Sequence, residues 1–173
     1  MVALHRNGEL RTDKTRFGII DAQSVQNADT AREKGYDAGK KVSGVKRHIV
    51  VDTQGLPHAF LVTTADVTDR AGALRMIALS LDNLSCVEKY LVDGGYSGEA
   101  FATAVKELCD AEVEVARRNE LHTFAVLPKR WVVERTFGWL DKSRRLWKNC
   151  ERTLHKACQM LVFAFIALLL HRF

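Results

Sequence analysis

The stretch Phe17–Val25 reads FGIIDAQSV, and the fold can be worked out from it. It is a short apolar run that contains one carboxylate, Asp21. A run of this length predicts a buried β-strand, here one that ends near Asp21. Charged groups are seldom placed inside apolar strands without a partner. Asp21 is therefore a candidate site residue, and the alternative is an edge or turn aspartate that accepts backbone hydrogen bonds.

Two more strands are predicted after this one, at Lys46–Thr53 and His58–Thr64. Gln54-Gly55 and then Pro57 supply a turn between them, so the three strands suggest an antiparallel meander. The glycine- and lysine-rich segment Ala31–Val45 is predicted to be a loop.

The second half of the chain alternates helical and strand patterns. Helices are predicted at Asp69–Leu84, Glu99–Leu108, Arg130–Lys148 and Leu154–His171, and strands at Lys89–Val92 and Glu112–Ala116. A meander followed by this alternation predicts an α/β domain with a mixed five-stranded sheet flanked by helices. The order β-β-β-α-β-α-β-α is that of the ribonuclease H-like fold. We expect a lead-in over residues 1–16, the domain over 17–153, and an apolar helix over 154–173 that packs on the domain or on a partner.

Composition narrows the class of protein. The 173 residues are 47% hydrophobic and 27% charged, which is typical of a globular chain, and the net charge of +5 only modestly favours a polyanionic partner. The four cysteines lack C-x-x-C spacing and suit a reducing compartment. No apolar leader is visible, and the apolar run Met160–Leu170 is shorter than the roughly 20 residues that a bilayer requires. We expect a cytoplasmic protein with no membrane partner.

Two further carboxylates join Asp21 as candidates. Asp93 ends a predicted strand before two glycines, and Glu134 borders the apolar stripe of a helix. If the first and fourth strands are neighbours, Asp21 and Asp93 face each other and the helix can bring Glu134 over them. Three clustered carboxylates would repel one another unless they held a hard dication. The pattern favours two Mg²⁺ or Mn²⁺ ions about 3.5–4 Å apart. A turn-capping role for Asp93 and an Arg130–Glu134 ion pair are the alternatives.

Five motifs in one order resemble bacterial insertion-sequence transposases of the DDE type, the group often split over two reading frames. These motifs are GIIDAQSV, GYDAGKKVSGVKRHIVVDTQGLP, LVTTADVTDRAGA, LVDGGYSG and LPKRWVVERTFGWLDKSRRL. The resemblance implies a ribonuclease H-like fold, a two-metal mechanism that cuts and rejoins double-stranded DNA at inverted-repeat ends and in the target, and a homo-oligomeric active complex.

Carried over by position, the resemblance makes Asp21, Asp93 and Glu134 the catalytic, metal-binding triad, and Arg130 the arginine of the glutamate motif. Leu127 stands where the related pattern has tyrosine, and Asp141 where it has lysine. Only about twenty residues precede Asp21, so we expect the upstream DNA-binding segment to be missing. An inactive transposase fragment that binds DNA or regulates an intact copy is the alternative function, and a nuclease or resolvase of the same fold is a third.

Basic residues cluster within or beside these motifs and suit a phosphate backbone track, although such clusters are often only solvated. The predicted DNA contacts are Lys46, Arg47, His48, Lys129, Arg130, Lys142, Arg144 and Arg145. No helix-turn-helix or zinc-finger pattern is present in the sequence, so the predicted contacts carry little base specificity.

Overall fold

The computed structural model describes residues 2–8, 12, 14–116 and 130–171. The strands are β1 (Phe17–Gln26), β2 (Gly35–Asp37), β3 (Val42–Val51), β4 (Pro57–Thr64), β5 (Lys89–Val92) and β6 (Glu112–Val115). The helices are α1 (Val2–Gly8), α2 (Asp69–Leu79), α3 (Leu81–Leu84), α4 (Glu99–Cys109), α5 (Arg130–Asp141) and α6 (Leu154–Leu170), with a 3₁₀ turn η1 at Gly94–Tyr96.

The five predicted strands are all present and form one mixed sheet. β1 pairs antiparallel with β3 and parallel with β5, β4 pairs with β3, and β6 pairs with β5. The spatial order is therefore β4-β3-β1-β5-β6, with the meander on one side and the parallel strands on the other. This confirms the predicted α/β architecture.

The expectation of a loop over residues 31–45 is wrong in two respects. β2 lies within that segment and pairs with the first residues of β3, and β3 itself starts at Val42. Gly44 pairs with both Gln26 of β1 and Gly35 of β2. A Cβ atom at Gly44 would meet the Val25 carbonyl oxygen at 2.0 Å, so only glycine allows this close approach.

β1 also extends further than predicted, because β3 pairs with it from Ile19 to Gln26. β5 pairs only with Phe17 to Ile19. Asp21 therefore lies in the middle of a long strand, just beyond the point where β5 ends.

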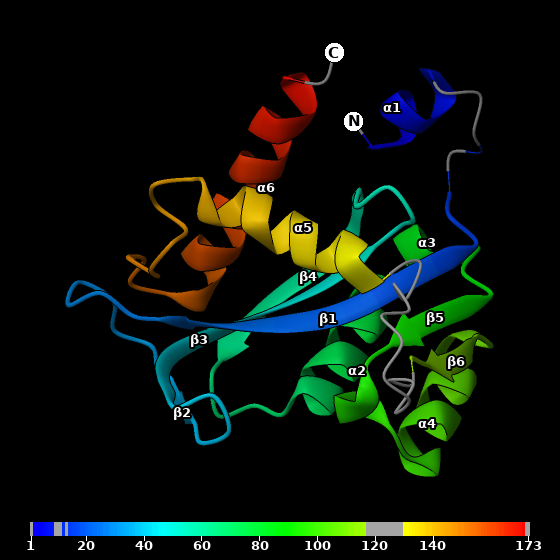
Figure 1. The fold of residues 1–173 in the computed structure, drawn as a ribbon, viewed down its shortest axis with the longest axis horizontal. Coiled ribbons are helices and arrows are strands. Elements are labelled where there is room, and N and C mark those ends of the chain that lie inside the picture. Colours follow the sequence, from blue (N-terminus) through cyan, green and yellow to red (C-terminus); the bar gives the residue numbers. More distant parts are fainter. Residues whose placement is uncertain (1, 9–11, 13, 117–129, 172–173) are drawn as a thin grey trace, which may run out of the picture.

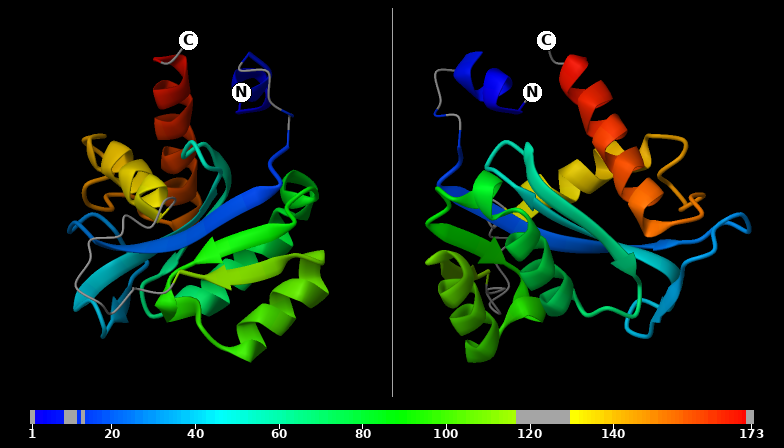
Figure 2. Two further views of the ribbon diagram at one scale, coloured as in Figure 1. Left: turned by 45° about the vertical axis from the view of Figure 1, so that its right-hand side comes forward. Right: turned by 180° about the vertical axis from the view of Figure 1, so that it is seen from behind.

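Two apolar layers cover the two faces of the sheet (Figure 1; Figure 2). Ile19 and Val25 of β1 pack with α5 and α6, whereas Ile20 packs with α2 and α4 on the opposite face. This alternation follows from the two-residue period of a strand. Since both faces are covered, most side chains of β3 are buried in one of two helical layers.

Two helix boundaries differ from the prediction. The first helix is divided at Ser80 into α2 and α3, and α5 ends at Asp141, so that residues 142–148 form turns. The early end of α5 lets Leu146, which is 3% exposed, fold back into the core. α6 buries Ala157, Leu161, Phe165 and Leu169 against the domain. Among the described helices, none combines the length and apolarity that a membrane crossing requires.

Candidate active site

Asp21 lies on β1, and Asp93 directly follows its parallel neighbour β5. The β1–β5 register pairs Phe17 with Lys89 and Ile19 with Leu91. Continued by two residues, this register places Asp21 opposite Asp93, at the carboxyl end of β5. The carboxyl ends of parallel strands are where α/β proteins form their sites.

Strand alternation places Asp21 on the face that α5 covers, and Asp93 directly follows β5. Ile19 lies two residues before Asp21 and Leu91 two residues before Asp93, and both apolar residues belong to the core beneath α5. Asp21 accepts a hydrogen bond from the Ala22 N–H at 2.7 Å, and Asp93 accepts one from the Gly95 N–H at 2.8 Å. Both residues are partly exposed, so the pair is accessible from solvent.

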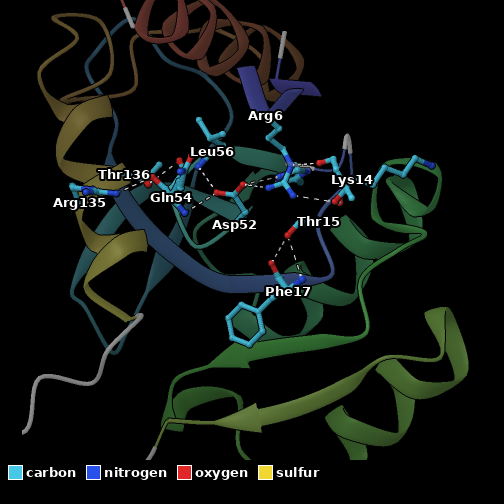
Figure 3. Close-up of polar contacts among 12 residues, drawn as sticks. Arg6, Lys14, Thr15, Phe17, Asp52, Gln54, Leu56, Arg135 and Thr136 are labelled. Atoms are coloured by element: carbon cyan, nitrogen blue, oxygen red, sulfur yellow. Dashed lines mark hydrogen bonds and ion pairs between the residues drawn. The ribbon is translucent and has the colours of Figure 1, made fainter. Parts of the chain in front are cut away.

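α5, which carries Glu134, is fixed to the turn between β3 and β4 (Figure 3). The Arg135 guanidinium donates to the Gln54 carbonyl at 2.8 Å, and the Thr136 hydroxyl donates to the Gly55 carbonyl at 3.2 Å. Asp52 holds the turn from within, because its carboxylate accepts from the backbone N–H groups of Gln54 and Leu56. Arg6 forms a buried ion pair with the same carboxylate, so the N-terminal segment also supports this turn.

The other end of α5 is tied to the central strands by Asp141. Its carboxylate accepts from the Gln23 side chain at 3.0 Å and lies 3.8 Å from the Arg47 guanidinium. Asp141, which stands where the resembled pattern has lysine, therefore has structural partners in Gln23 and Arg47. Glu134 is exposed and precedes Asp141 by two helical turns, so the two residues share one side of α5. That side of the helix reaches Gln23, which follows Asp21 by two residues.

The donor chemistry of this site fits a hard dication. Among the described residues, no three His, Cys, Asp or Glu side chains lie close enough together to hold a metal ion. A Mg²⁺ ion usually takes one or two protein carboxylates and completes its shell with water and phosphate oxygens. Asp21 and Asp93 would be enough for that number of carboxylates, and Glu134 lies on α5.

The family model described as "Transposase DDE domain" matches residues 12–170, nearly the whole chain. The chain belongs to the DDE transposase family. It is 34% identical over 150 residues to a Burkholderia cepacia protein assigned as the transposase of insertion sequence element IS402, with 83% of this chain and 69% of that protein covered.

Solved structures show that this transposase chain has a ribonuclease H-like fold. The catalytic core domain of BIV integrase matches with a TM-score of 0.50 and 13% identity, over 88% of this chain and 82% of that one. A chain of the simian T-cell lymphotropic virus intasome in complex with PP2A regulatory subunit B56 gamma matches with a TM-score of 0.56 and 16% identity. The match covers 88% of the transposase chain but 47% of the viral chain, so the transposase chain spans about half the length of the viral one.

The structure corrects the expected phosphate contacts of Lys46, Arg47 and His48. They are 4%, 3% and 0% exposed, because β3 is a central strand with helices on both faces. The Arg47 guanidinium donates to the Leu146 carbonyl, and burial lowers the pKa of Arg47 to about 10 against the opposing effect of Asp141. His48 contacts the Thr63 hydroxyl at 3.0 Å, and burial lowers its pKa to about 4.

The Lys46 ammonium is held by three polar partners. Its ammonium lies 3.1 Å from Asp37 and 2.8 Å from Asp69, and it donates to the Val67 carbonyl at 2.8 Å. Burial acts to lower the pKa of Lys46, but the hydrogen bonds to Asp69 and Asp37 outweigh it and raise the pKa. Lys46 thus joins β2, β3 and the start of α2 from inside the transposase.

The other predicted DNA contacts divide into two groups. Lys142, Arg144 and Arg145 are exposed in the turns after α5, and Arg145 is paired with Glu151 at 2.6 Å. Lys129 and the side chain of Arg130 lie outside the described residues, as does Leu127.

Two groups near the carboxylates escaped the sequence reasoning. Arg70, in the first turn of α2, donates to the Gly95 carbonyl at 2.9 Å and so fastens the turn that follows Asp93. Beside it is an open pocket of about 570 Å³ lined by Asp37, Gly39, Lys40, Lys46, Thr68, Asp69, Arg70 and Gly95. The second group is Tyr96, which is 1% exposed. In the sequence, the one feature that pointed to Tyr96 is its position three residues after Asp93.

Proposed function

We propose that this transposase cuts DNA strands and joins them to a target, with Asp21, Asp93 and Glu134 as its metal-binding carboxylates. The observation that supports the proposal is the β1–β5 register, which pairs Ile19 with Leu91, two residues before Asp21 and Asp93. Membership of the DDE transposase family supports it. When bound, two Mg²⁺ or Mn²⁺ ions would activate a water molecule or a DNA 3′-hydroxyl as the attacking group, and they would stabilise the leaving oxygen.

The side chains of the chain would hold the metal ions and fix the helix that carries Glu134. Asp21 would present oxygen donors from β1, and Asp93 would do so from the turn that directly follows β5. Arg135 and Thr136 hold α5 on the β3–β4 turn, and Asp141 holds its end on Gln23. Glu134 directly precedes Arg135 on the helix, so its approach to the aspartates would be set by the packing of α5.

DNA would reach the carboxylates along the exposed basic side chains at the end of α5. Lys142 and Arg144 are exposed in the turns that begin after Asp141. They follow Glu134 in the chain and can neutralise backbone phosphates without reading bases. Inverted-repeat ends and target DNA are the proposed substrates, and a homo-oligomer is the proposed active form.

The test is strand nicking of a supercoiled plasmid that carries the DNA flanking the coding sequence, with Mg²⁺ or Mn²⁺, followed on agarose gels. Asp21→Asn, Asp93→Asn and Glu134→Gln should each lower nicking by more than about 100-fold, the upper range for loss of an outer-shell metal partner. Asp82→Asn is the matched control, since Asp82 is an exposed carboxylate on α3 beside the start of β1. Full activity in the three site variants would end the proposal.

The same experiment distinguishes the proposed enzyme from the alternative function, an inactive fragment that regulates an intact copy. Plasmid binding without metal-dependent nicking by the wild-type chain, together with inhibition of an intact relative in a mixed assay, would favour a regulatory fragment over an enzyme.

A further inference from the structure

The open pocket beside Arg70 has more positive than negative charge among the side chains that line it. Its two carboxylates, Asp37 and Asp69, lie 3.1 and 2.8 Å from the Lys46 ammonium between them. The Lys46 side chain is 5% exposed, so it belongs to the wall of the pocket. The two exposed cations, Lys40 and Arg70, outweigh the one negative charge that Lys46 leaves.

Lys40 is held on the backbone of β1 directly after Asp21. Its ammonium donates to the Ala22 carbonyl at 3.0 Å, and the Ala22 N–H donates to the Asp21 carboxylate at 2.7 Å. β5 pairs with β1 only as far as Ile19, so this carbonyl lies past the end of the paired region. The Asp69 carboxylate is 3.9 Å from the same ammonium, which is too long for a hydrogen bond. An ammonium has three donors, so Lys40 keeps donors for a ligand in the pocket.

Arg70 is held in the same way on the turn that follows Asp93. Its Nε donates to the Gly95 carbonyl at 2.9 Å, and the Gly95 N–H donates to the Asp93 carboxylate at 2.8 Å. This bond uses one of the five donors of a guanidinium, and the exposed side chain lines the pocket. Each candidate aspartate is therefore linked, through the backbone of one residue, to one exposed cation of the same pocket.

We propose that this pocket binds a backbone phosphate of the DNA strand beside Asp21 and Asp93, with Lys40 and Arg70 as the donors to the phosphate. The inference rests on the proposed function, because it takes DNA as the substrate. The pocket is open and its exposed cations are long side chains, which suits a strand that passes through better than a small enclosed anion. Phosphate contacts of this kind fix the register of DNA on a protein without reading its bases.

Lys40→Gln with Arg70→Gln removes both exposed cations and keeps polar side chains. The matched control is Arg75→Gln with Lys106→Gln, which lowers the net charge by the same amount. Arg75 is exposed further along α2, and Lys106 is 56% exposed on α4. Neither belongs to the lining of the pocket as the described residues form it. A difference between the two double variants therefore reports contact with DNA and not the overall charge of the chain.

The experiment is a fluorescence-anisotropy titration of the full chain with a labelled duplex of the DNA that flanks the coding sequence, in EDTA and at several salt concentrations. Loss of one phosphate contact should lower the log–log salt slope by about one and weaken binding to all sequences alike. We expect this result for Lys40→Gln with Arg70→Gln, and the wild-type slope for the control pair. Lys40→Arg with Arg70→Lys, which keeps both charges, should restore the slope.

Thermal unfolding of each variant separates binding from a structural role. If the two cations only hold Ala22 and Gly95, their loss lowers the melting temperature and leaves the salt slope unchanged, which would overturn the inference.

Further results would decide between this pocket and the proposed function. If Lys40→Gln with Arg70→Gln keeps the DNA slope but loses binding of inorganic phosphate in calorimetry, the pocket takes a free anion and the inference fails. If the slope is unchanged while Asp21→Asn abolishes nicking, the inference fails and the proposed function stands. If the slope falls but the wild-type chain shows no metal-dependent nicking, the phosphate site stands and the proposed function fails.

Discussion

Gly55 connects the β3–β4 turn to the helix of Glu134, and Gly55→Ala should disturb both. Gly55 has φ +84°, a left-handed conformation that costs an alanine about 1–2 kcal/mol. A Cβ atom there would lie 2.6 Å from the Thr136 hydroxyl oxygen, 3.2 Å from the Trp139 ring and 3.4 Å from Val132. Because all three contacts belong to α5, the helix must move away from the turn.

The expected loss follows from these contacts. Overpacking of a filled site costs about 1–3 kcal/mol. The hydrogen bond from Thr136 to the Gly55 carbonyl, 3.2 Å long, contributes roughly 1 kcal/mol more if it breaks. The smaller conformational freedom of alanine in the unfolded chain offsets about 0.4–1 kcal/mol. We expect a net loss of about 2–5 kcal/mol, and a melting temperature lower by about 2–4 °C for each kcal/mol.

The assay is urea unfolding followed by circular dichroism, with Gly138→Ala as the matched control. Gly138 lies on the same helix, and a Cβ atom added there would have nothing within 4 Å, so alanine at this position should stabilise the helix by about 0.5–1 kcal/mol. Thr136→Ala should recover part of the loss in the Gly55→Ala background, because the closest contact is removed. Equal stability of Gly55→Ala and the wild type would refute the placement of α5 on this turn.

Three further predictions concern β3 and the DNA surface. Gly72→Ala should lower the free energy of unfolding in urea by about 2–4 kcal/mol, since its Cβ would lie 2.0 Å from the buried His48 ring; an unchanged value would refute this packing. Burial lowers the pKa of His48 to about 4, so the unfolded chain takes up the proton first and stability should fall by about 3 kcal/mol as pH drops from about 6.5 to about 4. His48→Gln should flatten that slope, and an equal slope in both proteins would contradict it. Lys142→Ala with Arg144→Ala should reduce the salt dependence of plasmid-DNA binding, measured by fluorescence anisotropy, by up to about two in log–log slope, whereas Arg145→Ala should do less because Glu151 already holds Arg145.

Local patterns in the sequence were sufficient to predict the elements that carry the candidate carboxylates. A short apolar run predicted β1 around Asp21, and a strand followed by two glycines predicted the end of β5 before Asp93. These patterns are local because a strand and its turn depend on near neighbours in the chain. The carboxylate triad and its metal ions remain predictions for the experiments above.

The fate of the basic stretch on β3 could not be predicted from its sequence. Lys46, Arg47 and His48 have the composition of a phosphate-binding segment, yet all three are buried. Their partners Asp37, Asp69 and Asp141 come from β2, α2 and α5, and only the folded chain brings them within reach. A charged side chain can be buried when a distant segment supplies its counter-charge.

The sequence by itself predicted most of the strands and helices, though not β2 or the break at Ser80, and it showed that Asp21 interrupts an apolar run. The tertiary structure alone decided that β5 lies beside β1 in a register that pairs Ile19 with Leu91. It also decided that helices cover both faces of β3 and so enclose its cations. The reason is physical: strand register and burial depend on contacts between segments far apart in the chain, whereas secondary structure is set largely by neighbouring residues.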